Sequence, residues 1–174
     1  MNANARTRLI AVCVTAALVT VAWLGRTEAA ESRDCSTTKK SKHFVANIPM
    51  SPGDSPNHEI SQFVRVDVVS SANPDFDGGE QIIYGQADQV AGTGSHRGYS
   101  VSVQKSGDRV YYKWEGAHKT VIKDGGAWEL DYEGKFELTG GTGKFSNIRG
   151  SGTYRGSVNA QRGATEQVQC QATY

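Results

Sequence analysis

The chain has 174 residues, of which 37% are hydrophobic and 21% are charged, and its formal net charge is +1 at pH 7. This length supports one domain with a hydrophobic core of its own. A nearly neutral chain lacks the dense basic face that nucleic-acid binding requires. The one basic cluster, Lys39-Lys40-Ser41-Lys42, lies in a polar segment that we expect to be a solvated tail.

Residues 1–30 have the pattern of a secretory signal peptide. Arg6 and Arg8 precede an apolar run from Leu9 to Leu24, and small residues at the end of the segment suit cleavage after Ala29 or Ala30. The run is shorter than the roughly 20 residues of a membrane-spanning helix, and an uncleaved anchor is the alternative. Cleavage removes three arginines and one glutamate, which leaves 16 basic and 17 acidic side chains. We therefore expect a secreted or periplasmic protein with no membrane association after cleavage.

Two cysteines remain in the mature chain, Cys35 near its beginning and Cys170 near its end. Because exported proteins fold in an oxidising compartment, we predict a disulfide between them. The bond would close a loop of 135 positions, which is worth roughly 4–5 kcal/mol on the chain-entropy model. Free or intermolecular thiols are the alternative. No histidine is close in sequence to either cysteine, so we expect neither a metal site nor a cofactor.

The mature chain begins with a polar segment, residues 31–56. We expect a loosely structured lead-in there, with at most a short strand at His43–Ile48. Residues 57–174 are expected to form the folded domain. Its first strand carries valines at 64, 66 and 68 that alternate with Arg65 and Asp67, so the pattern predicts buried valines and solvent-facing charges.

Alternation of apolar and polar residues marks further strands. They are expected at Glu80–Ala91, Tyr99–Gln104, Arg109–Trp114, Thr120–Lys123, Trp128–Thr139, Thr153–Val158 and Gln167–Tyr174. Gly92–Gly98 is expected to be a glycine-rich connection, and Ser106-Gly107-Asp108 the turn of a hairpin. The mature chain shows no convincing amphipathic helix. About eight short strands in one domain predict an all-β fold, a barrel or a sandwich.

The longest alternating run, Trp128–Thr139, separates aromatic and aliphatic residues from charges. Its charged face carries Glu129, Asp131, Glu133 and Glu137, which we expect on a solvated barrel exterior rather than in a catalytic site. Gly134 lies among the apolar residues and predicts a bend or a bulge.

A glycine cluster follows this strand. The segment Leu138-Thr139-Gly140-Gly141-Thr142-Gly143-Lys144-Phe145, followed by Ile148-Arg149-Gly150, resembles the GGTGxF…G signature of the allene oxide cyclase and dirigent barrel superfamily. The match covers roughly Gly134–Gly156. The resemblance implies a single antiparallel barrel of eight strands, two of which this segment joins. An ordinary glycine-rich turn of another barrel type is the alternative.

The residues themselves explain why such a segment needs glycine. Gly140, Gly141 and Gly143 can adopt positive φ or let backbones approach closely. Phe145 and Ile148 can then enter the end of the barrel. The resemblance also implies cyclase or isomerase chemistry without a cofactor, and association as dimers or trimers. No catalytic residue of the superfamily can be matched position by position, so the catalytic residues are unknown.

The titratable residues offer few candidates for chemistry. The four mature histidines, His43, His58, His96 and His118, are dispersed in polar stretches, and we expect all four on the surface. Glu80 and Asp88 share a parity with Tyr84 and Val90, so one of the two carboxyls could enter the barrel. Burial beside aromatic rings would raise its pKa and suit it to acid–base work.

Aromatic residues form the strongest binding candidate. The expected ligand-binding set is Tyr84, Tyr112, Trp114, Trp128, Tyr132 and Phe136, which occupy apolar parities of their strands. Core packing is the alternative interpretation of this set. An eight-stranded barrel is just wide enough either to be filled by side chains or to hold one small ligand.

These sequence patterns are compatible with three functions. The leading hypothesis is an exported barrel that binds a small, largely apolar molecule in its lumen. The second is a cofactor-independent cyclase or isomerase, and the sequence leaves open whether the protein is an enzyme. The third is an exported protein-binding module or inhibitor. A row of outward apolar residues would indicate the third, and only Phe63 and Val69 on the first strand are expected to face outward.

Overall fold

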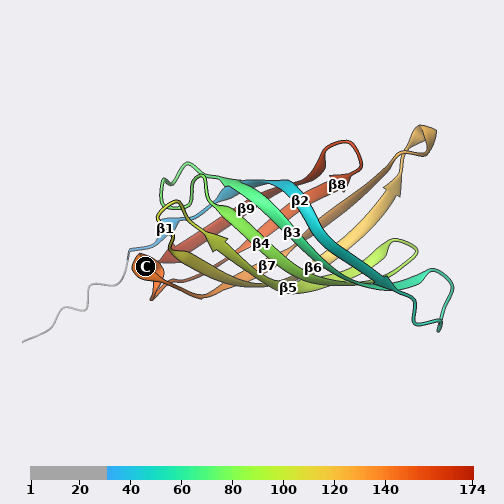
Figure 1. Cartoon of the computed structure of the whole chain (residues 1–174), viewed down its shortest axis with the longest axis horizontal. Coiled ribbons are helices and arrows are strands. Elements are labelled where there is room, and N and C mark those ends of the chain that lie inside the picture. Colours follow the sequence, from blue (N-terminus) through green and yellow to red (C-terminus); the bar gives the residue numbers. More distant parts are fainter. Residues whose placement is uncertain (1–30) are drawn as a thin grey trace, which may run out of the picture.

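The computed structural model describes residues 31–174, so the expected signal peptide lies outside the described residues. Strands dominate this part of the chain and form a closed eight-stranded antiparallel barrel plus one outside strand (Figure 1). The strands are β1 (Arg33–Asp34), β2 (Thr37–Met50), β3 (His58–Ser70), β4 (Glu80–Val90), β5 (Thr93–Val103), β6 (Arg109–Ile122), β7 (Trp128–Gly141), β8 (Arg149–Asn159) and β9 (Gly163–Thr173). Two short 3₁₀ turns are η1 (Asp124–Gly126) and η2 (Gly143–Phe145).

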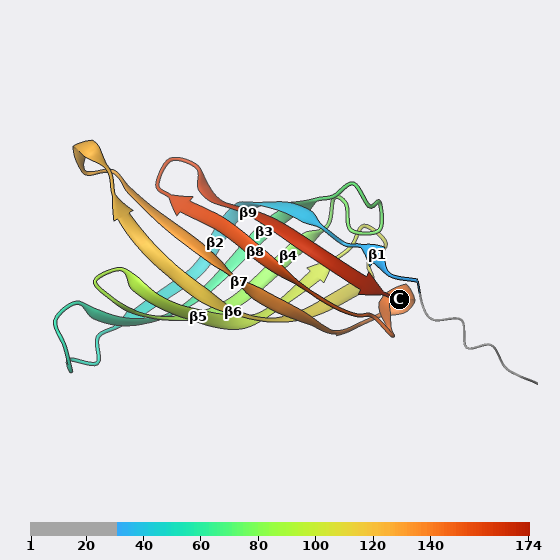
Figure 2. The same ribbon diagram turned by 180° about the vertical axis from the view of Figure 1, so that it is seen from behind.

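Each strand from β2 to β9 pairs with the next one along the chain, and β9 returns to pair with β2. This last contact closes the barrel between Thr37–Lys40 and Thr165–Val168. Strand β1 pairs with β9 further along, at Arg33 and Asp34. Figure 2 shows β8 and β9 side by side across the near face of the barrel. Among residues 31–174, no helix is long and apolar enough to cross a membrane. The predicted all-β barrel of eight antiparallel strands is confirmed.

The polar segment 31–56 is not a loose lead-in, because most of it belongs to the sheet. Strand β2 pairs with β3 from Thr38 opposite Ser70 to Met50 opposite Ile60. The expected domain boundary at residue 57 therefore falls in the turn between these two strands. Register shifts after Ser41 and after Phe44 interrupt the alternation of β2, so the strand shows no clear period of two in the sequence.

Two other expected boundaries were wrong. Strand β5 begins at Thr93, so most of the predicted connection Gly92–Gly98 is strand, and the turn is Ala91-Gly92 with φ of 50° and 76°. Thr120–Lys123 is not a separate strand, because β6 continues to Ile122. The inward row of β5 begins with Gly94, His96 and Gly98, which produce no apolar alternation. By contrast, the hairpin turn at Ser106-Gly107-Asp108 is confirmed, with φ of 88° at Gly107.

Strand β3 is inverted relative to the prediction. Arg65 and Asp67 are 5% and 1% exposed and lie inside the barrel, whereas Val68 is 42% exposed on its outer face. The inward row of β3 also contains Phe63 and Val69, which were expected to face outward. Alternation fixes which residues share a face but not which face is buried. On the outer wall, Val64 is instead the register partner of Tyr84, which pairs with Tyr99.

One end of the barrel is closed by an apolar plug. Phe145 and Ile148 are fully buried there, as predicted for the glycine segment. Gly140 and Gly143 have φ of 147° and 56°, values that side chains rarely adopt. Phe76, from the loop between β3 and β4, packs against Phe145 with ring centroids 5.3 Å apart and was not singled out from the sequence.

Glycines in the barrel wall make room for aromatic rings from adjacent strands. A Cβ on Gly152 would lie 2.6 Å from Phe136 Cζ, and one on Gly156 would lie 2.5 Å from Tyr132 Cζ. Gly134 lies under the ring of Tyr154 in the same way. The register is continuous through Gly134, and the irregularity of β7 lies where Leu138 and Gly140 pair with Tyr112 and Tyr111. Of the predicted bend or bulge at Gly134, the bulge is therefore absent, and the glycine makes room for the ring of Tyr154.

The predicted disulfide between Cys35 and Cys170 is confirmed. Their Cα atoms are 4.8 Å apart, and the two residues are 3% and 5% exposed within the plug. The backbone N–H of Cys35 also donates to the carbonyl of Cys170 at 3.1 Å. The bond thus fastens the beginning of the barrel to its last strand.

Replacing both cysteines by serine should lower the free energy of unfolding by about 4 kcal/mol, because a cross-link spanning a sequence separation of 135 is lost. Urea unfolding of the mature protein at pH 7 measures this. Reductant should lower the free energy of unfolding of the wild type to that of the double variant. It should leave the free energy of unfolding of the double variant unchanged. Equal stability of the wild type and the double variant would refute the prediction.

Candidate functional site in the barrel lumen

The barrel encloses a cavity of about 570 Å³. It extends from the plug toward the opposite end, where it is lined by Phe44, Trp128 and Ala160. All eight strands of the barrel contribute lining residues. The interior of this barrel is therefore not filled by its own side chains.

Five of the six predicted binding residues line this cavity. They are Tyr112, Trp114, Trp128, Tyr132 and Phe136, which come from the inward rows of β6 and β7. Phe63 from β3 adds a further ring, 6.3 Å from that of Trp114. The lumen therefore presents a nearly continuous aromatic wall.

Tyr84 is the exception, because it lies on the outer face of β4 and is 49% exposed. Glu80 and Asp88 share its parity, so neither carboxyl enters the barrel. The inward row of β4 is Gln81, Ile83, Gly85, Ala87 and Gln89. Because this inward row has glutamine at both ends and glycine in the middle, its sequence pattern is that of a solvent-facing row.

Two histidines lie inside the barrel, contrary to the expectation of four surface histidines. His96 and His118 are 8% and 6% exposed and line the lumen. His43 is exposed as expected, and His58 is partly buried between Asp54 and Asp88. Since His96 and His118 lie in glycine-interrupted strand ends, no apolar pattern marks them as buried.

These histidines belong to a chain of hydrogen bonds across the lumen. His96 Nε2 is 2.8 Å from the hydroxyl of Tyr154, and its Nδ1 is 3.3 Å from His118 Nδ1. His118 Nε2 is 3.1 Å from Gln89 Oε1, and Gln89 Nε2 donates to Glu59 at 3.1 Å. The five residues come from five strands, β8, β5, β6, β4 and β3.

One set of tautomers satisfies every bond in the chain. If His118 Nε2–H donates to Gln89, its Nδ1 must accept, so His96 Nδ1–H donates to it. His96 Nε2 then accepts from the Tyr154 hydroxyl. The network thus assigns both imidazoles as neutral, with all hydrogen bonds running from Tyr154 toward Glu59.

The surroundings favour these protonation states. Burial, with a contribution from His118, lowers the pKa of His96 to about 4. Burial also lowers the pKa of His118. The pKa of Tyr154 is raised by burial and by the carboxylate of Glu166. At neutral pH, His96 is therefore a neutral base and Tyr154 a protonated acid, and both line the cavity.

A group of four charges lies beside this chain. Arg65 Nη2 is 2.8 Å from Asp67 and 3.2 Å from Glu166, and Lys39 Nζ is 2.8 Å from Glu166. Burial alone would raise the pKa of Glu166, but Lys39 and Arg65 outweigh it and lower the value. Burial raises the pKa of Asp67, which Arg65 offsets only in part. Lys39, expected in a solvated tail, thus belongs to this group, and its side chain is 10% exposed.

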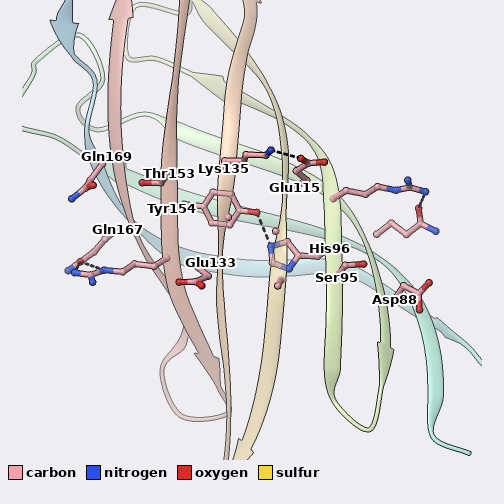
Figure 3. A pocket seen from close by; sticks show the side chains of 16 residues that line it. Asp88, Ser95, His96, Glu115, Glu133, Lys135, Thr153, Tyr154, Gln167 and Gln169 are labelled. Carbon is pink, nitrogen blue, oxygen red and sulfur yellow. Dashed lines mark hydrogen bonds and ion pairs between the residues drawn. The ribbon is translucent and has the colours of Figure 1, made fainter.

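Figure 3 shows that the Tyr154–His96 pair also borders a pocket on the outer wall. Gly116 and Gly134, register partners on β6 and β7, form the wall there and have no side chains. Around them lie outward charged residues, including Glu115, which pairs with Lys135 at 3.1 Å. The Tyr154–His96 pair therefore lies between the lumen and the outer pocket.

Two comparisons of the sequence with known proteins found no match. No protein-family model matches the chain, and no curated protein matches it significantly in sequence. Among residues 31–174, no group of three or more His, Cys, Asp or Glu side chains could hold a metal ion.

Acidification should destabilise the protein through His96. Its pKa is about 4 when folded and 6.5 unperturbed, so the unfolded state binds more protons as the pH falls from 6.5 toward 4. His96 alone should lower the free energy of unfolding by about 2 kcal/mol between pH 7 and pH 5. Urea unfolding at both pH values measures this.

Two variants isolate the effect of His96. His96→Gln should lose distinctly less stability than the wild type between the two pH values. His43→Gln, at an exposed position of β2, should lose as much as the wild type. An unchanged pH dependence in His96→Gln would contradict the assignment of a neutral, buried imidazole.

Proposed function

We propose that this protein is an exported barrel that binds one small, largely apolar molecule in its lumen. The observation that carries the proposal is the cavity of about 570 Å³ bordered by aromatic side chains. Small-molecule sites typically enclose roughly 300–1,000 Å³ and combine apolar walls with a few placed polar groups. The signal-peptide pattern of residues 1–30 and the disulfide support export.

The alternative of a purely structural interior is less favourable. Native interiors are close-packed, and voids larger than a water molecule are few. Here the rings of Phe136 and Tyr132 lie against wall glycines instead of filling the centre. The glycines thus keep the lumen wide. A wide lumen is useful for binding a ligand, whereas a barrel filled by its own side chains has no need of one.

Filling the lumen should abolish binding. Ala87 lines the cavity, and in Ala87→Phe the added ring would occupy the space of the ligand. Native mass spectrometry of wild-type protein purified from exporting cells should show a retained small molecule. Its occupancy in Ala87→Phe should fall by at least about tenfold, equivalent to about 1.4 kcal/mol.

Gln86→Phe is the matched control, because its side chain faces the outer wall on the same strand. It should retain the molecule like the wild type. Ligand-free wild type, or an occupied Ala87→Phe variant, would overturn the proposed lumen binding.

The hydrogen-bonded Tyr154–His96 pair favours a second candidate, a cofactor-independent isomerase or cyclase. Such a reaction rearranges bonds within one molecule and needs groups that return a proton to it. The Tyr154 oxygen can take a proton from the bound molecule while its own proton moves to His96 Nε2, and the reverse transfer returns a proton to the molecule. Both residues line the lumen. The sequence resemblance to the allene oxide cyclase and dirigent superfamily points to the same class of reaction.

If the protein is an isomerase or cyclase, it should convert its substrate and release a product of the same mass. Incubation of an extract from the exporting cells with wild-type protein should convert one component into an isomer of equal mass, detected by chromatography. Tyr154→Phe should slow the conversion by roughly 10²-fold or more, whereas Tyr99→Phe, on the outer wall, should not. A molecule that is bound and always recovered unchanged would exclude the isomerase and leave the binding function.

A further inference from the structure

We propose that the ligand carries an uncharged oxygen head group, a carbonyl or a hydroxyl, which is held in the lumen by Gln81, near the plug, and by Arg65. This inference rests on the proposed lumen binding and specifies its ligand class. Gln81 is the register partner of Ser102, which pairs with the plug residue Val110. Both Gln81 and Arg65 line the cavity.

Unpaired donors at this position point to an acceptor from outside the chain. Gln81 is 1% exposed, yet its Nε2 has no hydrogen-bond partner among residues 31–174. The Nε–H of Arg65, which is 5% exposed, also lacks a partner within the same residues. Buried donors are nearly always paired in native proteins. An oxygen atom of a ligand in the adjoining cavity would satisfy them.

The four charged side chains around Arg65 require this oxygen to be uncharged. Lys39 and Arg65 are already paired with Glu166 and Asp67, two cations with two carboxylates. A ligand carboxylate would add a buried charge with no counter-charge, which is strongly unfavourable. An amine would do the same with opposite sign. The pairing therefore excludes charged head groups although the site contains arginine and lysine.

A hydroxyl has one further partner in the same place. Asp67 is the register partner of Gln81, and its Oδ1 has no hydrogen-bond partner in the described part of the chain. A hydroxyl oxygen can accept from Gln81 while its hydrogen is donated to Asp67. A carbonyl satisfies the two donors alone. The body of the ligand, in either case, lies against the aromatic wall formed by Trp114, Tyr132 and Phe136.

Three probes with one bicyclic body test the head group. They are 2-acetylnaphthalene, with an uncharged carbonyl, 2-isopropenylnaphthalene, in which a CH₂ replaces the oxygen, and 2-naphthoate, with a carboxylate. Titration calorimetry of the ligand-stripped mature protein at pH 7 gives their dissociation constants. The ketone should bind about tenfold more tightly than the hydrocarbon, the value of one good hydrogen bond with buried donors. The carboxylate should bind most weakly.

Substitution of Gln81 should remove the preference selectively. In Gln81→Leu the ketone and the hydrocarbon should differ by less than about threefold, the remainder coming from Arg65. The control Gln62→Leu, at an exposed outer position of the neighbouring strand, should keep the wild-type order. Because the substitution of buried Gln81 can also disturb folding, a second measurement uses the wild-type protein. It is the infrared carbonyl stretch of bound 2-acetylnaphthalene. It should shift to lower frequency than in hexane.

The outcomes separate the two proposals. If all three probes bind with equal affinity, or 2-naphthoate binds most tightly, the head-group inference is wrong and lumen binding stands. An unshifted carbonyl stretch together with an unchanged preference in Gln81→Leu means that a structural water satisfies Gln81, which also overturns the inference. If none of the probes binds and the exported protein retains no molecule, lumen binding itself fails.

Discussion

The contact between aromatic rings and wall glycines is the constraint on which the rest of this structure depends. An eight-stranded barrel is only just wide enough to be filled by its own side chains. In this protein, Phe63 lies over Gly85, Trp114 over Gly98, and Tyr154 over Gly134. Each ring occupies the place that a Cβ on the adjacent strand would take, so it lies close to the wall. The barrel can therefore be lined by large aromatic residues and still contain a cavity.

The interior also reverses the usual distribution of polarity. Val64, Val66 and Val68 of β3 face outward, while Arg65, Asp67, Glu166 and Lys39 lie inside. Buried ion pairs contribute little net stability, because desolvation opposes the attraction between the charges. Their presence in a small barrel is therefore better explained by what they provide in the lumen, which is a set of fixed, mutually neutralised polar groups. The apolar plug and the disulfide at one end supply the stability that this interior does not.

The sequence predicts the parts of this fold in which local pattern and burial agree. Strand β7 alternates cleanly, Asp131, Glu133 and Glu137 are exposed on the outer face as expected, and its aromatic residues line the lumen. Glu129 was also expected to be solvated, but it is 8% exposed and pairs with Arg162 at 3.0 Å. The disulfide and the turn of the glycine segment were also predicted correctly, because residues 31–174 contain only two cysteines and a positive φ favours glycine. Prediction failed where an inward row is polar or contains glycine. Most of strand β2 was missed because register shifts interrupt its alternation, and the first half of β5 was missed because its inward row contains glycines. In β3 the alternation was recognised, but Val64, Val66 and Val68 were assigned to the wrong face. Only the closed sheet determines which parity is inside.

The same reasoning explains why no motif reveals the candidate site. Tyr154, His96, His118, Gln89 and Glu59 come from five strands and share no local spacing. Register brings them together, and the glycines refine their placement. Tyr154 reaches His96 Nε2 at 2.8 Å because its ring lies over Gly134, where any side chain would displace it. The contact that keeps the lumen open thus also positions its acid and base. A substitution at Gly134 would therefore affect both cavity shape and proton chemistry, so the binding and catalytic hypotheses concern one physical arrangement.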